Sequence, residues 1–221
     1  MAAAHPLTRR STLLALAGAP LALSAFTGAG WAQSVPQPEG EVDMDELLEP
    51  GPLPEMAKGD ADAPVTIVEY ASMTCGHCAT FHNQTWPAIR EKYVDTGKAR
   101  LIMREFPFDP RAAAAFMLAR CAPNDAYFPM IDVLFEQQST WARAENARAP
   151  LENIAKLAGF TQESFEACLT DQQLLDDVNA IRVRAAEEFG VNATPTFFIN
   201  GQKYTGALSV DQMSAIIDSM L

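Results

Sequence analysis

The chain has 221 residues, of which 48% are hydrophobic, an ordinary share for a globular protein. A chain of this length can form one good hydrophobic core and carry an inserted subdomain. The formal net charge of −12 argues against a protein that binds nucleic acid, because an acidic surface repels phosphates. No run after about residue 35 is long and apolar enough to span a bilayer, so we expect a mature form that does not cross the membrane.

The N-terminus has the three parts of an export signal. The pair Arg9-Arg10 precedes an apolar stretch over residues 13–26, and Gly30-Trp31-Ala32 then forms a small-x-Ala site. We predict that residues 1–32 are a signal peptide cleaved near Ala32, because glycines and a proline make the apolar stretch a poor membrane anchor. The arginine pair is typical of twin-arginine export, whereas Thr12 departs from that motif, so general secretion stays open.

Residues 33–58 are rich in proline, glycine and acids. This composition predicts a tether, with one short helix over residues 43–48. We expect ordered structure to begin near Met56.

A β-α-β unit follows the tether. The run Val65–Tyr70 is almost entirely apolar, which is typical of a buried parallel strand. The motif Cys75-Gly76-His77-Cys78 comes next and opens a predicted helix that reaches about residue 94 and that Pro87 should kink. A second strand over about residues 99–106 completes the unit.

The remainder of the chain is a helical block and then a hairpin. Apolar spacing predicts helices at residues 111–121, 127–138, 151–157, 164–169 and 171–189. Residues 196–199 form a strand, Asn200-Gly201 is a strong hairpin signal, and Ser209 opens the last helix with a capping box. The order predicts the α/β class, with a mixed central sheet and an inserted all-helical domain.

The cysteine motif is placed for thiol–disulfide exchange, because it lies at a strand-to-helix turn. The free N–H groups and the dipole of the helix favour a thiolate at Cys75, and a protonated His77 would add positive charge. Cys75, nearest the helix start, should be the exposed nucleophile with a pKa well below that of an ordinary thiol. Cys78, one turn further in, should be buried and resolve the mixed disulfide.

A zinc site is the alternative reading of the same motif. A structural zinc ion needs four ligands, and His82 could supply only a third. No second Cys-x-x-Cys is present, so we predict no metal. We expect His82 to be a partly exposed helix residue rather than a catalyst, and Met73 and Phe108 to offer apolar surface to unfolded substrates.

This arrangement resembles the DsbA-like periplasmic thiol oxidoreductases, which have a thioredoxin fold with a helical insertion. The first shared feature is the cysteine motif between strand and helix. The second is Thr194-Pro195 directly before the strand 196–199, where the family has its cis-proline loop. The third is Glu69, six residues before Cys75, where related enzymes hold a buried acidic residue. The likeness covers roughly residues 56–220.

The resemblance implies a division of the chain and a role for each feature. Residues 59–108 and 190–221 would form the thioredoxin-like domain and residues 109–189 the inserted helical domain. Pro195 would be cis, and Thr194, Pro195 and Gly76 would contact an extended substrate strand. Without the resemblance, Pro195 is an ordinary turn proline.

The sequence leaves two interpretations of Glu69 open. Its neighbours in the strand are apolar, and a buried carboxyl there could relay a proton to or from Cys78. It could equally be the polar member of an exposed strand face.

Cys121 and Cys168 lie in separate predicted helices. In an oxidising compartment an even number of cysteines can pair completely, so we predict a second, structural disulfide. It would close a loop of roughly 45 residues and stabilise the fold by about 4 kcal/mol on the chain-entropy model. Two buried free thiols are the alternative.

We therefore expect a periplasmic enzyme that introduces disulfides into exported proteins through the Cys75–Cys78 pair, with no other cofactor. Its partners would be reduced or unfolded exported proteins and, as the family implies, a membrane protein that reoxidises it. We expect a monomer, because residues 41–49 are too short and acidic for a strong helical interface. The alternatives are an isomerase or reductase of the same fold and, from a different class, a metal-binding carrier.

Overall fold

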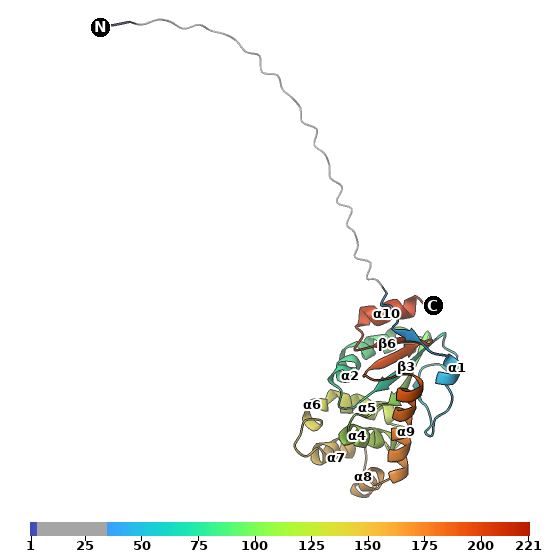
Figure 1. Cartoon of the computed structure of the whole chain (residues 1–221). Helices are drawn as coiled ribbons and strands as arrows, with labels where there is room; N and C mark the ends of the chain where they lie inside the picture. Colours follow the sequence, from blue (N-terminus) through green and yellow to red (C-terminus); the bar gives the residue numbers. More distant parts are fainter. Residues whose placement is uncertain (4–34) are drawn as a thin grey trace. The chain divides into compact units, whose positions relative to one another are not determined.

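The computed structural model describes residues 1–3 and 35–221 (Figure 1). Apart from Met1–Ala3, the predicted signal peptide and its cleavage site near Ala32 lie outside the described residues. Among the residues that are described, no helix is both long and apolar enough to cross a bilayer.

A six-stranded sheet forms the centre, in the order β1-β6-β5-β3-β4-β2. Only β3 and β4 are parallel, and the other neighbours are antiparallel, so the sheet is mixed, as predicted. The strands are β1 Gly40–Glu41, β2 Met56–Lys58, β3 Val65–Ala71, β4 Ala99–Glu105, β5 Thr196–Ile199 and β6 Gln202–Thr205. Asn200 and Gly201 both have positive φ (45° and 87°), as a tight turn between β5 and β6 requires.

Helices surround the sheet and fill the segment between β4 and β5. Before that segment come α1 Met44–Leu47 and a run of four short pieces, which are α2 Gly76–Thr80, η1 Phe81–Thr85, α3 Trp86–Ile89 and η2 Arg90–Val94. The segment itself holds α4 Pro110–Arg120, α5 Tyr127–Glu136, α6 Gln138–Trp141, α7 Arg148–Leu157, α8 Gln162–Leu169 and α9 Gln172–Glu188. The last helix is α10 Val210–Asp218.

The helix predicted to kink at Pro87 runs from Gly76 to Val94 with two π-helical turns, η1 and η2, on either side of α3. Proline cannot donate the hydrogen bond that an α-helix needs at this place. A wider turn is one way for a helix to continue past such a position, and wide turns are common near functional sites.

The two faces of the sheet carry different layers. The face with Ile67 and Leu101 packs against the helix 76–94 and α10, and the opposite face, with Val68 and Ile102, packs against α1 and the C-terminal half of α9. The helical block α4–α8 packs at the carboxyl ends of the two parallel strands, where Ala71 and Met103 belong to its core. This edge of the sheet is also where the cysteine motif begins.

Helix α9 belongs to both the helical block and the sheet layer. Its N-terminal half contributes Val178 to the core of the block, whereas Ile181 and Ala185 in its C-terminal half pack on the sheet. One continuous helix therefore joins the helical block to the layer that covers the sheet.

The predicted tether is partly structured, which corrects the expectation that order begins near Met56. Strand β1 pairs with β6, and the expected short helix is α1, which Asp43 caps. Leu47 is completely buried, and Arg184 of α9 donates a hydrogen bond of 2.8 Å to the Glu46 carbonyl. The hydrogen-bond partners of this segment in β6 and α9 lie more than 130 residues away, so its own composition could not reveal them.

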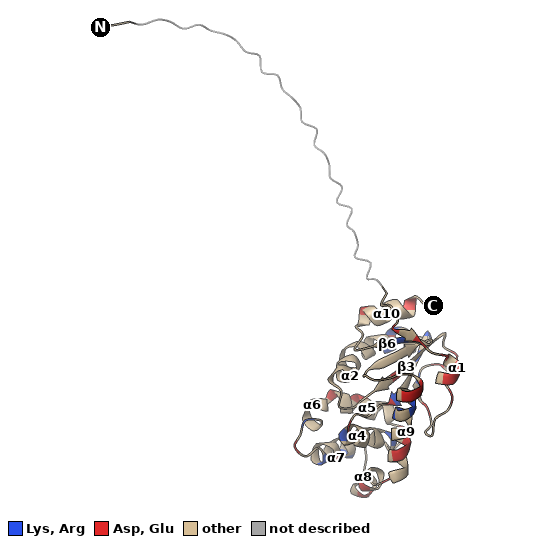
Figure 2. Ribbon diagram, in the orientation of Figure 1, with Lys and Arg blue, Asp and Glu red and all other residues tan. Residues whose placement is uncertain are grey.

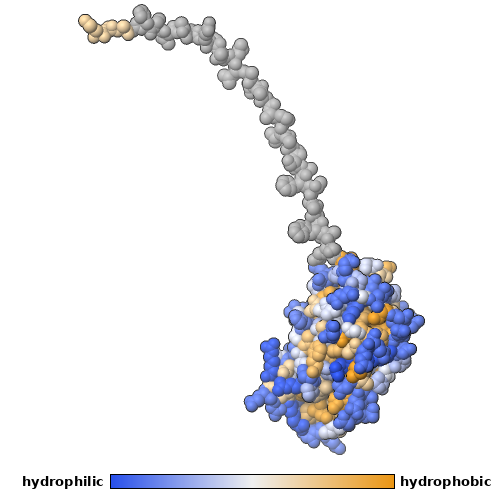
Figure 3. All heavy atoms as spheres, in the orientation of Figure 1, coloured by the Kyte–Doolittle hydropathy of each residue, from blue (hydrophilic) through white to orange (hydrophobic). Residues whose placement is uncertain are grey.

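Acidic side chains are spread over several elements, including α1 and α9 (Figure 2). Hydrophilic residues cover much of the face shown in Figure 3, with apolar residues between them. Such a surface is consistent with charge that serves solubility.

Candidate active site

The cysteine motif begins at the N-terminus of α2, a few residues after β3 ends. Cys75 is the N-cap residue and has an extended backbone (φ −77°, ψ 120°). Cys75 is half-buried, whereas Cys78 is fully buried, and both are free thiols in this structure. The positions therefore differ in the way that a nucleophile and a resolving cysteine require.

The loop before β5 faces the first cysteine. The Thr194-Pro195 peptide bond is cis, and the Cys75 Sγ atom lies 3.2 Å from the Thr194 carbonyl oxygen, to which the thiol donates. Antiparallel pairing of β3 with β5 sets Tyr70 opposite Thr196. The residues that follow β3 and those that precede β5 therefore meet at the same end of these two strands. The structure thus brings Cys75, Thr194 and Pro195 together.

Hydrogen bonds lower the pKa of the Cys75 thiol to about 5. The largest cause is the Cys78 thiol, which donates to the Cys75 thiolate, and burial opposes it. The Thr194 side chain and the backbone N–H groups of Cys78 and His77 act in the same direction as the Cys78 thiol. Among the residues that the structure describes, the buried Thr194 hydroxyl has no hydrogen-bond partner while Cys75 is a thiol, so it is available to the thiolate. His77 contributes its backbone N–H, and its side chain is exposed.

Cys78 has the opposite electrostatics. Burial raises the pKa of the Cys78 thiol well above its usual value, and the hydrogen bond to Cys75 and the negative charge of Glu69 raise it further. At neutral pH the pair therefore holds one negative charge, located on Cys75.

A buried acid–base pair lies beneath the motif. Glu69 in β3 is completely buried, and its two carboxylate oxygens lie 3.0 and 3.1 Å from His82 Nε2. The His82 ring is only 5% exposed and stacks on Phe135 of α5, with the ring centres 4.3 Å apart. The expectation that His82 is partly exposed was wrong, because the helical block covers the face of the helix that carries it.

Two polar contacts from the helical block reach the active-site turn. Gln138 Nε2 at the start of α6 donates to the carbonyls of Met73 and Cys75 at 2.8 and 2.9 Å. The Thr74 hydroxyl donates to Asp109 Oδ2 at 2.6 Å, and Asp109 also caps α4. Sequence reasoning missed both contacts because their partners are 35 to 65 residues apart and no local pattern marks them.

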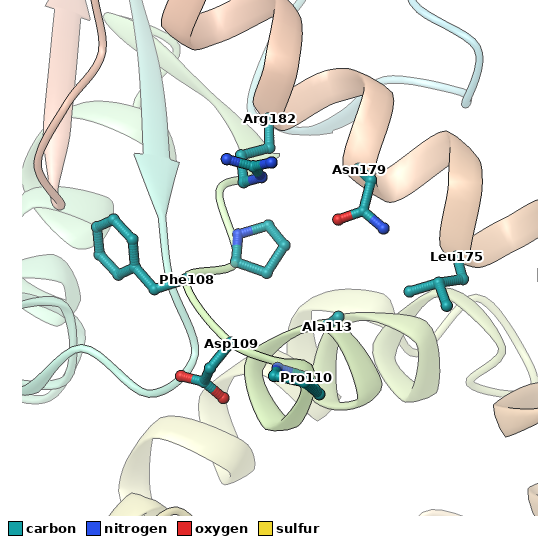
Figure 4. A pocket seen from close by; sticks show the side chains of 8 residues that line it. Phe108, Asp109, Pro110, Ala113, Leu175, Asn179 and Arg182 are labelled. Atoms are coloured by element: carbon teal, nitrogen blue, oxygen red, sulfur yellow. The ribbon is translucent and has the colours of Figure 1, made fainter.

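Met73 and Phe108 were both expected to offer apolar surface. This expectation was wrong for Met73, whereas the exposure of Phe108 agrees with it. Met73 is fully buried in the core of the helical block, whereas Phe108 is 55% exposed. Phe108 borders a hollow of about 410 Å³ between the loop before α4 and the helix α9 (Figure 4). A neighbouring hollow shares Asp109 and Pro110 with it and extends to Thr74. An indented surface therefore continues from Phe108 to the residue before Cys75.

The other two cysteines form a disulfide within the helical block. Cys121 is the C-cap of α4, and it is joined to Cys168 of α8, 47 residues later. Within residues 1–3 and 35–221, no group of three or more His, Cys, Asp and Glu side chains is placed to hold a metal ion.

Comparisons with known proteins agree with this architecture. The thioredoxin family model matches residues 53–219. A putative protein-disulfide oxidoreductase of Rickettsia bellii is 34% identical over 170 residues, which cover 76% of this chain and 64% of that protein. Similar proteins of Rickettsia typhi and Rickettsia felis are covered to 62% and 60%, so the chain spans less than two thirds of the length of these curated relatives.

Solved structures show the same fold. The alpha-DsbA1 of Wolbachia pipientis is 34% identical, with a TM-score of 0.74 over 80% of this chain and 94% of that one. A protein-disulfide isomerase of Novosphingobium aromaticivorans shares the fold, with a TM-score of 0.66 and 19% identity over 75% of this chain and 97% of that one. The chain therefore belongs to the thioredoxin-like family, in its DsbA-like branch with a helical insertion.

Proposed function

We propose that this chain is a periplasmic thiol:disulfide oxidoreductase that oxidises reduced exported proteins through the Cys75–Cys78 pair. The observation that carries the proposal is the contrast between the two thiols. Cys75 is accessible beside the cis-proline loop and has a pKa of about 5, while Cys78 is buried and has a raised pKa.

The oxidised form would react in two exchange steps. A client thiolate attacks the Cys75 sulfur, the Cys75–Cys78 bond breaks, and Cys78 leaves with the electron pair and takes a proton. A second client thiolate then attacks the client sulfur of the mixed disulfide, and Cys75 leaves as a thiolate. The client loses two electrons and gains a disulfide, and the enzyme is left in its dithiol form.

The low pKa of Cys75 makes this direction favourable. A thiolate of low pKa is a good leaving group in the second step. Because hydrogen bonds stabilise the thiolate of the reduced protein, the disulfide becomes the less stable state, and the pair acts as an oxidant.

We assign the proton for Cys78 to the Glu69–His82 pair. The Cys78 sulfur is fully buried, so a negative charge that forms on it has a high free energy unless a proton neutralises it. Glu69 is close enough to raise the pKa of Cys78, and His82 is hydrogen-bonded to its carboxylate. A proton held by this pair can therefore neutralise Cys78 as it leaves.

We place the client strand beside Thr194, Pro195 and Gly76. A side chain at Gly76 would meet no atom of residues 35–221 within 4 Å, so in this part of the chain the position leaves open space next to the nucleophile. Backbone pairing in such a place gives affinity that tolerates many client sequences. The exposed Phe108 ring and the hollow beside it offer apolar surface to unfolded segments.

The location and partners follow from the same proposal. The predicted signal peptide supports export to the periplasm, where disulfides persist. A membrane protein that reoxidises Cys75–Cys78 completes the scheme, as the family resemblance implies. Residues 41–49, which are too short and acidic for a strong helical interface, favour a monomeric enzyme.

Turnover of a reduced client tests the function. The oxidised mature chain, mixed with a reduced, unfolded disulfide protein, should transfer one disulfide per molecule and lose its own. Reoxidation of the client no faster than in the buffer alone would refute the proposal. Activity only on a client with scrambled disulfides would favour the isomerase of the same fold.

A further inference from the structure

Gln138 connects the helical block to the cysteine motif. It is the first residue of α6, and its side-chain nitrogen donates one hydrogen bond to the Met73 carbonyl and one to the Cys75 carbonyl, at 2.8 and 2.9 Å. Both partners are acceptors only, so the amide nitrogen, which has two N–H groups, must face the turn. A single side chain thereby holds residues on both sides of Thr74.

The Cys75 carbonyl is held from a second direction. It also accepts the Ala79 N–H at 3.1 Å, which is the first helical hydrogen bond of α2. Gln138 and Ala79 together fix the residue at the N-cap, while the Cys75 N–H bonds to the Ser72 carbonyl at 3.0 Å. The direction in which the Cys75 side chain leaves the backbone is set by these three contacts.

This placement matters for the thiolate in two ways. The backbone N–H groups of His77 and Cys78 stabilise the Cys75 thiolate only while the turn points its sulfur at the helix N-terminus. The Cys75 carbonyl carries partial negative charge on the same residue as that sulfur, and the Gln138 N–H group that it accepts offsets this charge.

We infer that Gln138 is a positioning residue, through which the helical insertion keeps Cys75 in the geometry that favours its thiolate. The role of this residue in turnover rests on the proposed function. Its effect on the ionisation of Cys75 does not, because ionisation is measured on the reduced protein without a client.

Three variants of the mature chain test the inference. Gln138→Leu removes both donors at similar volume, and Gln138→Glu removes them and adds a negative charge beside the turn. Gln137→Leu is the matched control, because Gln137 is the preceding residue, is also partly buried, and makes no side-chain hydrogen bond in the described part of the chain. The measurement is the ultraviolet absorbance of the thiolate, titrated against pH in the reduced protein.

We expect Gln138→Leu to have about three- to fivefold less Cys75 thiolate at pH 5 than the unchanged protein. Gln138→Glu should have less again, and Gln137→Leu should titrate like the unchanged protein. If Gln138 had a purely structural role, both Gln138 variants would have a lower melting temperature. Their Cys75 thiolate titrations would then match that of the unchanged protein.

An unshifted titration in folded Gln138→Leu would overturn the inference. If that variant does not fold, Gln138→Met, which keeps the length of the side chain without its donors, is judged by the same criterion. The two proposals can fail separately. If the unchanged protein fails to oxidise clients while Gln138→Leu still shifts the Cys75 titration, the proposed function is refuted and the inference about Gln138 stands.

Discussion

Cys75 and Cys78 lie at the start of one helix, whereas Cys121 and Cys168 join two helices of the insertion. The first pair is three residues apart, is reduced in this structure, and splits into one thiol of lowered pKa and one of raised pKa. The second pair is 47 residues apart and forms a disulfide beside the core of the insertion. Under the proposed function, the same side chain therefore serves reactivity in one place and stability in the other, according to the backbone and burial around it.

Replacing the nucleophile should produce the largest effect. In Cys75→Ser the client thiolate has no disulfide to attack, so we expect client oxidation to fall by about a thousandfold or more. The circular dichroism spectrum should stay the same, because Cys75 is only half-buried and serine is smaller. Turnover within tenfold of the unchanged protein would remove Cys75 from the mechanism.

Removing the second pair should affect stability rather than chemistry. The double variant Cys121→Ser with Cys168→Ser opens a loop of 47 residues, which costs about 4 kcal/mol on the chain-entropy model. Denaturant unfolding measures this loss, and the thiolate titration of Cys75 should be unchanged. A large shift in that titration would show that the structural disulfide also influences the ionisation of Cys75, so that the two pairs are not independent.

Changing the buried acid should shift the ionisation of the resolving cysteine, Cys78. In the Cys75→Ser background, Glu69→Gln removes a negative charge that raises the pKa of Cys78. We therefore expect roughly three- to tenfold more Cys78 thiolate at pH 9. A titration of the one remaining motif thiol measures it. No change would mean that Glu69 does not contribute to the electrostatics of the resolving cysteine.

A pH dependence should separate the stability of the reduced form from that of the oxidised form. The pKa of Cys75 is depressed on folding to about 5, so its thiolate contributes stability above the unfolded pKa and loses it as the pH falls through about 5. The oxidised form has no such thiol. Chemical denaturation should show the reduced form gaining stability over the oxidised form from about pH 5 to 8. A constant difference over this range would contradict the depressed pKa.

Local patterns predicted much of the fold. The strand at Val65, the hairpin turn at Asn200-Gly201 and the capping box at Ser209 are all present, because each depends on neighbouring residues. The cysteine motif and its position before a helix were also predicted from the sequence. The resemblance supplied the facing loop at Pro195, which spacing alone would have left as an ordinary turn.

The remainder depended on contacts between distant segments. His82 is buried because it stacks on Phe135, and α1 is held by a hydrogen bond from Arg184. The active-site turn is held by hydrogen bonds from Gln138. None of these side chains has a local pattern that marks its partner. A glutamine in an insertion is normally a surface residue, and only the folded chain shows it beside Cys75.

The redox equilibrium of the Cys75–Cys78 pair with glutathione tests the central claim most directly. If hydrogen bonds stabilise the Cys75 thiolate as described, the pair should be a strong oxidant, with a potential closer to about −120 mV than to the roughly −270 mV of a reductase such as thioredoxin. The fraction of reduced protein at each glutathione ratio gives this value. A potential at or below that of the reductase would contradict the account.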